Sequence, residues 1–172
     1  MAADKDLKTI LGKLKYSDDA KVVQQITEQT KQVHARMAGI KYKLAVMSGK
    51  GGVGKSMTTV NLALAFARQG NTVGLLDVDL NGPCVPRMLG LHGQSLKITP
   101  EGAIPPVGPL GVKVASMDFF LDDASPVRWK GPMDVSPVWL GLMEMNVIRE
   151  FLSDVAWGEL DYLLAEIGRA HV

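Results

Sequence analysis

The chain of 172 residues contains one cysteine, few aromatic residues and almost no net charge. A single thiol, Cys84, excludes an internal disulfide framework and fits a reducing compartment. The 19 basic side chains nearly balance the 18 acidic ones, so the overall charge gives no reason to expect a nucleic acid or a membrane as partner. No apolar run approaches the length that crosses a bilayer, and the charged start does not resemble a signal peptide. These absences predict a cytoplasmic protein.

The length is that of one domain with a substantial core, and helical patterns precede that domain. Residues 4–15 place leucine and isoleucine on one face of a lysine-rich helix. A second helical pattern begins near Ser17 and ends near Gly39. We therefore expect residues 1–40 to form an N-terminal helical arm and residues 41–166 to form a domain of the α/β class.

The segment Ser48–Thr59 reads Ser-Gly-Lys-Gly-Gly-Val-Gly-Lys-Ser-Met-Thr-Thr. Gly49, Gly54, Lys55 and Ser56 match the phosphate-binding loop pattern G-x-x-x-x-G-K-[ST]. Glycines let successive backbone N–H groups point at phosphate oxygens, and the following helix adds its positive end. In this pattern the lysine contacts the β- and γ-phosphates and the serine hydroxyl binds Mg²⁺. The residues expected to contact the nucleotide are Gly49, Lys50, Gly51, Gly52, Val53, Gly54, Lys55, Ser56 and Met57.

Apolar stretches flank this loop in the order strand, loop, helix. A strand is predicted at about Lys43–Met47, and the helix after the loop should end near Arg68 with Gly70 as its cap. Thr72–Leu76 is apolar without alternation, which is typical of a buried strand in a parallel sheet, and Val112–Met117 reads as a third strand. The pattern predicts a P-loop NTPase fold, a parallel sheet flanked by helices, with its ligand at the carboxyl ends of the strands.

Two carboxylates, Asp77 and Asp79, follow the second predicted strand and should face the phosphate loop. One carboxylate in such a place can hold Mg²⁺ through water, and the other can orient the water that attacks the γ-phosphate. The pair therefore predicts hydrolysis as well as binding of the nucleotide.

A second lysine, Lys50, follows the first glycine of the loop, although the phosphate nest does not need it. The Lys-Gly-Gly-x-Gly-Lys-Ser form resembles the deviant phosphate-loop ATPases, which include the Mrp/Nbp35 iron–sulfur carriers and the MinD and ParA positioning ATPases. The resemblance implies that Lys50 reaches the ATP of a partner subunit, and hence a homodimer. It also implies that Asp79 activates water, with Lys55 and Lys50 as further catalytic side chains. Asp77 and Ser56 would belong to the magnesium shell.

Two further segments resemble the Mrp/Nbp35 family specifically. Asp79–Gly90 is similar to the family's D-x-x-G-P-S-x-P-x-x-L-G switch segment, and Trp129–Met133 is similar to its W-R-G-P-M segment. Cys84 stands where serine is usual, and we interpret it as a small packed residue rather than a cluster ligand. Val155–Leu164 resembles the stretch that leads into the next core strand, which in the family ends in an aspartate of the magnesium shell.

The resemblance implies an ATPase that carries iron–sulfur clusters of the 4Fe–4S type as a homodimer. It would deliver them to apo iron–sulfur proteins, together with the cluster assembly machinery. The cluster ligands would be a C-terminal Cys-x-x-Cys pair, which these 172 residues do not contain. Met57 replaces a threonine that is common at its position in the family, which predicts weaker ATP binding.

The segment Ile167–Val172 is the translation of a common sequencing adapter, ATC GGA AGA GCA CAC GTC. We therefore interpret residues 167–172 as a non-native tail and the domain as incomplete. Glu166 stands where the family's magnesium-shell aspartate is expected. The adapter bases AG, which precede this hexapeptide, would complete a glutamate codon after a G from the gene. Because an aspartate codon also begins with G, the resemblance implies that the native residue at position 166 is this aspartate. A chain cut short there is expected to expose apolar strand edges and to be inactive. His34 and His92 have no other metal-ligating residues at ligand spacing near them in the sequence, and we expect both at the surface.

Two alternatives to a cluster carrier stay open. One is a positioning ATPase of the MinD/ParA kind that acts on a membrane or on DNA, which a C-terminal amphipathic helix or a basic patch would indicate. The other is a nucleotide-gated scaffold without useful turnover, which measured ATP hydrolysis would exclude.

Overall fold

The computed structural model describes residues 17–79, 82–120 and 147–168. The helix predicted at residues 4–15 and the segment Trp129–Met133 lie outside these residues. The second predicted helix is present as α2 (Ser17–Ala38). In the described part of the chain, no helix is long and apolar enough to span a membrane.

Four parallel strands form the main sheet, as the sequence predicts. The sheet order is β1 (Ile40–Val46), β6 (Leu160–Glu166), β2 (Val73–Asp77) and β5 (Lys113–Ser116). The last strand in the sequence therefore lies between the first two. The register places both Val46 and Asp77 opposite Glu166, so these residues meet at the carboxyl edge of the sheet.

Strand β2 is the most buried element, because all five of its residues are inaccessible to solvent. Gly74 in this strand has no room for a side chain. An added Cβ would lie 2.7 Å from Leu160 Cδ1 and 2.9 Å from Trp157 Cε3. Trp157 is fully buried, and its indole Nε1 donates a hydrogen bond of 3.3 Å to the Phe151 carbonyl. The core thus fills the space that the glycine leaves beside the strand.

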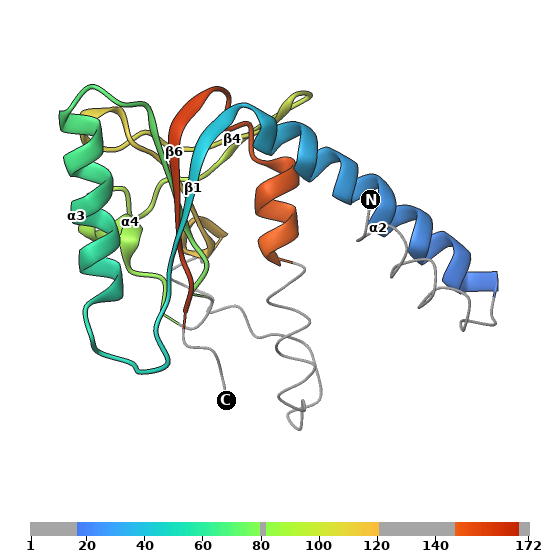
Figure 1. Cartoon of the computed structure of the whole chain (residues 1–172), viewed down its shortest axis with the longest axis horizontal. Helices are drawn as coiled ribbons and strands as arrows, with labels where there is room; N and C mark the ends of the chain where they lie inside the picture. Colours follow the sequence, from blue (N-terminus) through green and yellow to red (C-terminus); the bar gives the residue numbers. More distant parts are fainter. Residues whose placement is uncertain (1–16, 80–81, 121–146, 169–172) are drawn as a thin grey trace.

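Helices cover the sheet on two sides, as Figure 1 shows. Helix α3 (Lys55–Arg68) packs against β2 and β6, and its Phe66 ring stacks on Tyr162 of β6 at 4.1 Å. Residues 147–154 form a helical segment on the other side of the strands. Helix α2 extends away from the sheet, and the Arg36 guanidinium near its end donates to the carbonyls of Ser153 and Glu101. These layers confirm the predicted α/β architecture.

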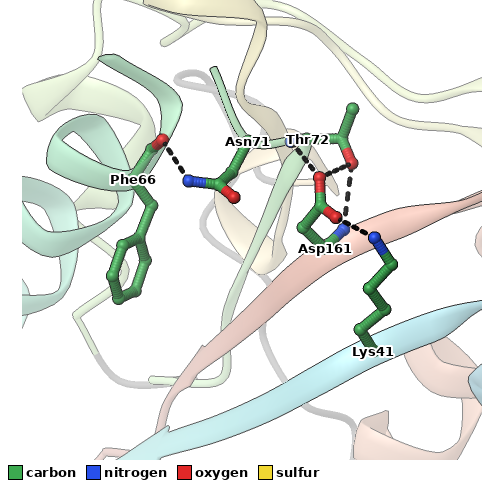
Figure 2. Close-up of polar contacts among 5 residues, drawn as sticks. All are labelled: Lys41, Phe66, Asn71, Thr72 and Asp161. Carbon is green, nitrogen blue, oxygen red and sulfur yellow. Dashed lines mark hydrogen bonds and ion pairs between the residues drawn. The ribbon is translucent and has the colours of Figure 1, made fainter. Parts of the chain in front are cut away.

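Asp161, at the start of β6, links the amino-terminal ends of the strands by hydrogen bonds (Figure 2). Its Oδ1 accepts a hydrogen bond of 2.6 Å from Lys41 Nζ on β1. Its Oδ2 accepts bonds of 2.9 and 2.8 Å from the backbone N and the hydroxyl of Thr72, just before β2. The Asn71 side chain ends helix α3 by donating to the Phe66 carbonyl at 3.0 Å. This network ties three strands together at the edge opposite the phosphate loop.

The remaining described elements connect the layers. A short helix α4 (Val85–Met88) follows β2, and a two-stranded hairpin is made by β3 (Lys97–Thr99) and β4 (Gly102–Ile104). Single turns η1 (Pro109–Gly111) and η2 (Met117–Phe120) flank β5.

Strand β1 lies at the edge of the sheet, and among the described residues it pairs only with β6. Tyr42 and Leu44 on this strand are 57% and 36% exposed, and Met47 just after it is 64% exposed. The expected exposure of an apolar strand edge is therefore present in the described part of the chain.

Candidate functional site

The phosphate loop connects the carboxyl end of β1 to the start of α3. Gly52 and Gly54 have φ angles of 73° and 89°, a left-handed conformation that favours glycine. The Ser48 hydroxyl donates 2.7 Å to the Lys50 carbonyl and closes the loop on itself. Helix α3 starts at Lys55 with no acidic residue in its first turn and no side-chain cap at Gly54. Its positive end is therefore available to an anion.

The predicted contact residues differ in exposure along the loop. Gly49, Lys50, Gly52, Val53 and Gly54 are exposed, whereas Gly51, Lys55 and Ser56 are half-buried. Met57 is 62% exposed and is not part of the buried core. The structure thus brings the loop backbone together with the Lys55 and Ser56 side chains at one surface.

Glu166, at the end of β6, contacts the loop directly. The Ser56 hydroxyl donates a hydrogen bond of 2.6 Å to Glu166 Oε1. Glu166 is 1% exposed, and its other carboxylate oxygen, Oε2, is buried with no hydrogen-bond partner among the described residues. Burial raises the pKa of Glu166, while the Ser56 hydrogen bond lowers it, the Asp79 charge raises it and the Lys55 charge lowers it. A buried acceptor without a donor is the expected place for a cation.

Asp77 is fully buried and is held by donors of the protein itself. Its Oδ1 accepts from the backbone N of Asp79 at 3.1 Å. Its Oδ2 accepts from the backbone N of Val85 and from the Ser116 hydroxyl, both at 3.2 Å. Burial, followed by the nearby Glu166 charge, raises the pKa of Asp77 to about 7. Glu166, and not Asp77, is therefore the carboxylate that is hydrogen-bonded to Ser56. The role of Asp77 in binding magnesium stays a prediction.

Asp79 lies beside these groups and is half-buried. Its Oδ1 accepts a hydrogen bond of 3.1 Å from Gly82 N, which shapes the start of the segment that follows. Asp77 is opposite Glu166 in the register of the sheet, and the Asp79 charge acts on Glu166. The three carboxylates therefore lie near the carboxyl ends of two neighbouring strands.

Cys84 is also near this group, although it is only partly buried. Burial raises the pKa of its thiol, and the three carboxylates act in the same direction, whereas a hydrogen bond with Ser56 lowers it. The prediction of a small packed residue did not anticipate that the thiol adjoins Ser56.

The donor set suits Mg²⁺. Oxygen atoms of Ser56 and Glu166 converge, and Mg²⁺ is usually bound by one or two carboxylates together with substrate phosphates rather than by an all-protein cage. In agreement, the described residues contain no group of three or more histidine, cysteine or acidic side chains that could hold a metal ion alone.

Some functional positions were not evident from the sequence. The resemblance placed Glu166 at the family's magnesium-shell position, but the sequence did not predict its direct contact with Ser56. His92, expected at the surface, is partly buried, and its Nδ1 lies 2.8 Å from Oδ2 of the buried Asp118. His34 is exposed, as predicted. No sequence signal links His92 to Asp118, because the contact depends on how the strands are ordered.

A strand, a glycine nest, a Lys-Ser pair at a helix start and carboxylates on adjacent strand ends define the class of P-loop NTPases. Residues 39–167 match the family model described as NUBPL iron-transfer P-loop NTPase, and the chain belongs to this family. The predicted relationship to iron–sulfur carrier proteins of the P-loop group is thereby confirmed.

Named relatives agree with this assignment. The chain is 47% identical over 151 residues to the iron-sulfur cluster carrier protein of Saccharolobus solfataricus, covering 87% of the chain and 48% of that protein. It is 45% identical over 139 residues to the cytosolic Fe-S cluster assembly factor CFD1 of Saccharomyces cerevisiae, covering 77% of the chain and 43% of that protein. The chain therefore spans about half the length of these relatives.

A solved structure is similar in fold. The nucleotide-binding protein of Archaeoglobus fulgidus, in complex with ADP, matches with a TM-score of 0.64 and 40% identity. The match covers 78% of this chain and 47% of that one.

Proposed function

We propose that this chain is the N-terminal, nucleotide-binding part of an ATPase that carries iron–sulfur clusters and delivers them to apo-proteins. The observation that carries the proposal is the contact between Ser56 and Glu166, which leaves one buried carboxylate oxygen without a donor at the phosphate loop. Family membership and the names of the relatives support the cluster as cargo.

The loop residues would bind the phosphates of ATP. Backbone N–H groups between Gly49 and Ser56 and the start of α3 attract the anion, and the Lys55 ammonium group neutralises it. Ser56, Glu166 and Asp77 would hold Mg²⁺, which would supply positive charge against the phosphate oxygens when it is bound. Asp79 would orient the attacking water, because its carboxylate lies next to this group and its backbone is fixed by Asp77.

Lys50 is an exposed charge at the rim of the loop. We assign it to the ATP of a second copy of the protein, so that hydrolysis takes place in a homodimer. An exposed lysine can reach across an interface because its four-carbon stem is long and flexible.

The cargo and its ligands belong to the longer protein. A 4Fe–4S cluster held by a Cys-x-x-Cys pair after the residues of this chain would be passed in the cytoplasm to apo iron–sulfur proteins. Residues 1–40 would form the helical arm, residues 41–166 the start of the ATPase domain, and residues 167–172 a non-native tail. Genomic DNA that continues from Leu164 into a longer reading frame would support this division, whereas genomic DNA that encodes the tail would contradict it.

The test of the proposed function is ATP hydrolysis by the full-length protein cloned from genomic DNA. We expect magnesium-dependent hydrolysis that Asp79→Ala removes by a factor of about 100 or more, the usual effect of losing a group that acts on the attacking water. Glu101→Ala, an exposed acidic residue in the turn of the hairpin, is the matched control and should retain activity.

Reconstitution with iron and sulfide should in addition produce the visible absorption of a cluster. Binding of ATP without hydrolysis would instead indicate the nucleotide-gated scaffold, and hydrolysis without a cluster would indicate the positioning ATPase.

A further inference from the structure

Two buried carboxylates hold residues 82–92, the segment that follows Asp79 in the described part of the chain, and the Ser116 hydroxyl links the two carboxylate residues. Asp77 binds the beginning of this segment, Asp118 binds its end, and Ser116 lies between the two carboxylates. All three are among the buried polar residues of the structure. Buried polar groups joined in this way restrict one another's positions, because any displacement leaves a donor or acceptor unsatisfied.

At the first end, Asp77 fixes two parts of the backbone. Its Oδ1 accepts from Asp79 N at 3.1 Å, and its Oδ2 accepts from Val85 N at 3.2 Å. Val85 is the first residue of α4 and is fully buried. The Asp77 side chain therefore fixes the backbone position of Asp79 and that of the first residue of α4.

The middle of the network is Ser116 at the end of β5, which pairs with Asp77 in the register of the sheet. Its hydroxyl donates 3.2 Å to Asp77 Oδ2 and accepts 3.2 Å from Asp118 N. A side chain that is 0% exposed and is used as both donor and acceptor holds the two carboxylate residues at a fixed separation.

At the second end, Asp118 contacts the segment again. Its side chain is 3% exposed, with Oδ2 at 2.8 Å from His92 Nδ1 and Oδ1 at 3.8 Å from Arg87 Nε. Arg87 lies in the last turn of α4, and His92 follows this helix by a few residues. The buried Asp118 carboxyl group thus contacts two side chains of the same segment.

We propose that Ser116, Asp118 and His92 are positioning residues for ATP hydrolysis, which they support by keeping Asp77, and through it Asp79, in place. The inference rests on the proposed function, because it assigns a task to residues behind the group that orients water. A displacement of about 1 Å in a reacting group can lower the rate by a factor of 100, so support at this distance has a measurable effect. None of the three residues belongs to the predicted nucleotide contacts, so their effect is expected on turnover and not on affinity.

The experiment compares Ser116→Ala and His92→Leu with wild type in the full-length protein. His92→Asn tests rescue, because its amide can donate from nearly the same place as the ring Nδ1, and Glu101→Ala is the control. Three quantities are measured: kcat for ATP hydrolysis, Kd for magnesium-ATP, and the rate at which iodoacetamide alkylates Cys84. The thiol reports on the segment because Cys84 directly precedes α4.

We expect Ser116→Ala and His92→Leu to lower kcat by about tenfold, the effect of one lost hydrogen bond to a charged group. The Kd should stay within about twofold, since no contact to the nucleotide changes. Alkylation of Cys84 should become faster, and His92→Asn should restore both kcat and the wild-type alkylation rate.

An unchanged kcat in both variants would overturn the inference, and so would a parallel loss of kcat and affinity, which indicates a purely structural role. If wild type does not hydrolyse ATP, the proposed function fails, while the alkylation rates still decide whether His92 and Ser116 hold the segment.

Discussion

The Ser56 hydroxyl donates a 2.6 Å hydrogen bond to Glu166 Oε1, although the two residues are 110 positions apart in the sequence. The bond joins the first residues of α3 to the end of the central strand β6, and it leaves Glu166 Oε2 buried without a donor. An arrangement that binds one carboxylate oxygen and leaves the other unsatisfied is stabilised when a cation enters. The phosphate loop and the sheet therefore meet at the place where we propose that Mg²⁺ binds.

Gly54→Ala tests the conformation of the loop. Alanine at a φ of 89° is strained by roughly 1–2 kcal/mol, and relief of this strain turns the loop N–H groups away from the phosphates. We expect ATP affinity to fall at least tenfold, measured with a fluorescent nucleotide. Gly70→Ala is the matched control, because Gly70 has a φ of 88° at the other end of α3. It should cost similar stability and leave the affinity unchanged; equal losses of affinity would contradict the loop assignment.

Met57→Thr tests the departure of the loop from its usual sequence. The Met57 side chain is 62% exposed at the third position of α3, so its replacement leaves no cavity. A threonine hydroxyl there can donate to a phosphate, and we expect ATP affinity to rise about fivefold, the effect of one net hydrogen bond. The measurement is the same nucleotide titration. An affinity equal to wild type would show that position 57 does not reach the phosphates.

Asp77 makes stability depend on pH in a defined direction. Its pKa is raised to about 7 in the folded protein, above the ordinary value of 3.8. Between these two values the unfolded chain has lost the proton that the folded protein retains, so the free energy of unfolding falls as pH rises. Urea unfolding from pH 4 to 8 without Mg²⁺ should show this decrease, and Asp77→Asn should reduce its slope. A wild-type stability that rises over this range would contradict the burial of Asp77.

Asp161 is expected to act on stability alone. Its hydrogen bond from Lys41, followed by those from Thr72, lowers its pKa to about 2. Its contribution is therefore complete above the unfolded value near 4 and is lost as pH falls toward 2. Asp161→Asn should lower the thermal midpoint at neutral pH without changing ATP affinity, because Asp161 lies at the start of β6, whereas the phosphate loop meets the end of this strand at Glu166. A changed affinity would show that the two edges are coupled.

The elements around the phosphate loop were predictable because their signals are local. Glycines at positive φ, a Lys-Ser pair and an apolar run on each side identify strand, loop and helix within one short stretch, and α3 ends at Arg68 as expected. The first strand was predicted at Lys43–Met47, whereas β1 begins at Ile40, since strand boundaries depend on pairing with β6.

The meeting of distant residues was not predictable from those signals. Strand β6 enters the sheet between β1 and β2, and only this order brings Glu166 beside Ser56 and Asp77. The same holds for His92 and Asp118, which come together because β5 lies next to β2. Chain order alone does not fix strand order, so the contacts between these residues were recognised only in the structure.

The most direct test of the magnesium site is a double-mutant cycle in the full-length protein, which combines Ser56→Ala with the change of the carboxylate at position 166 to its amide. This change is Glu166→Gln, or the change of aspartate to asparagine where the genomic DNA encodes the family's aspartate at this position. ATP affinity is measured with Mg²⁺ and with EDTA, and Glu159→Gln, an exposed residue just before β6, serves as control. We predict that each single variant loses about tenfold in affinity only when Mg²⁺ is present, and that the double variant loses no more than the worse single one. Losses that add independently, or that persist in EDTA, would contradict a shared magnesium site at Ser56 and Glu166.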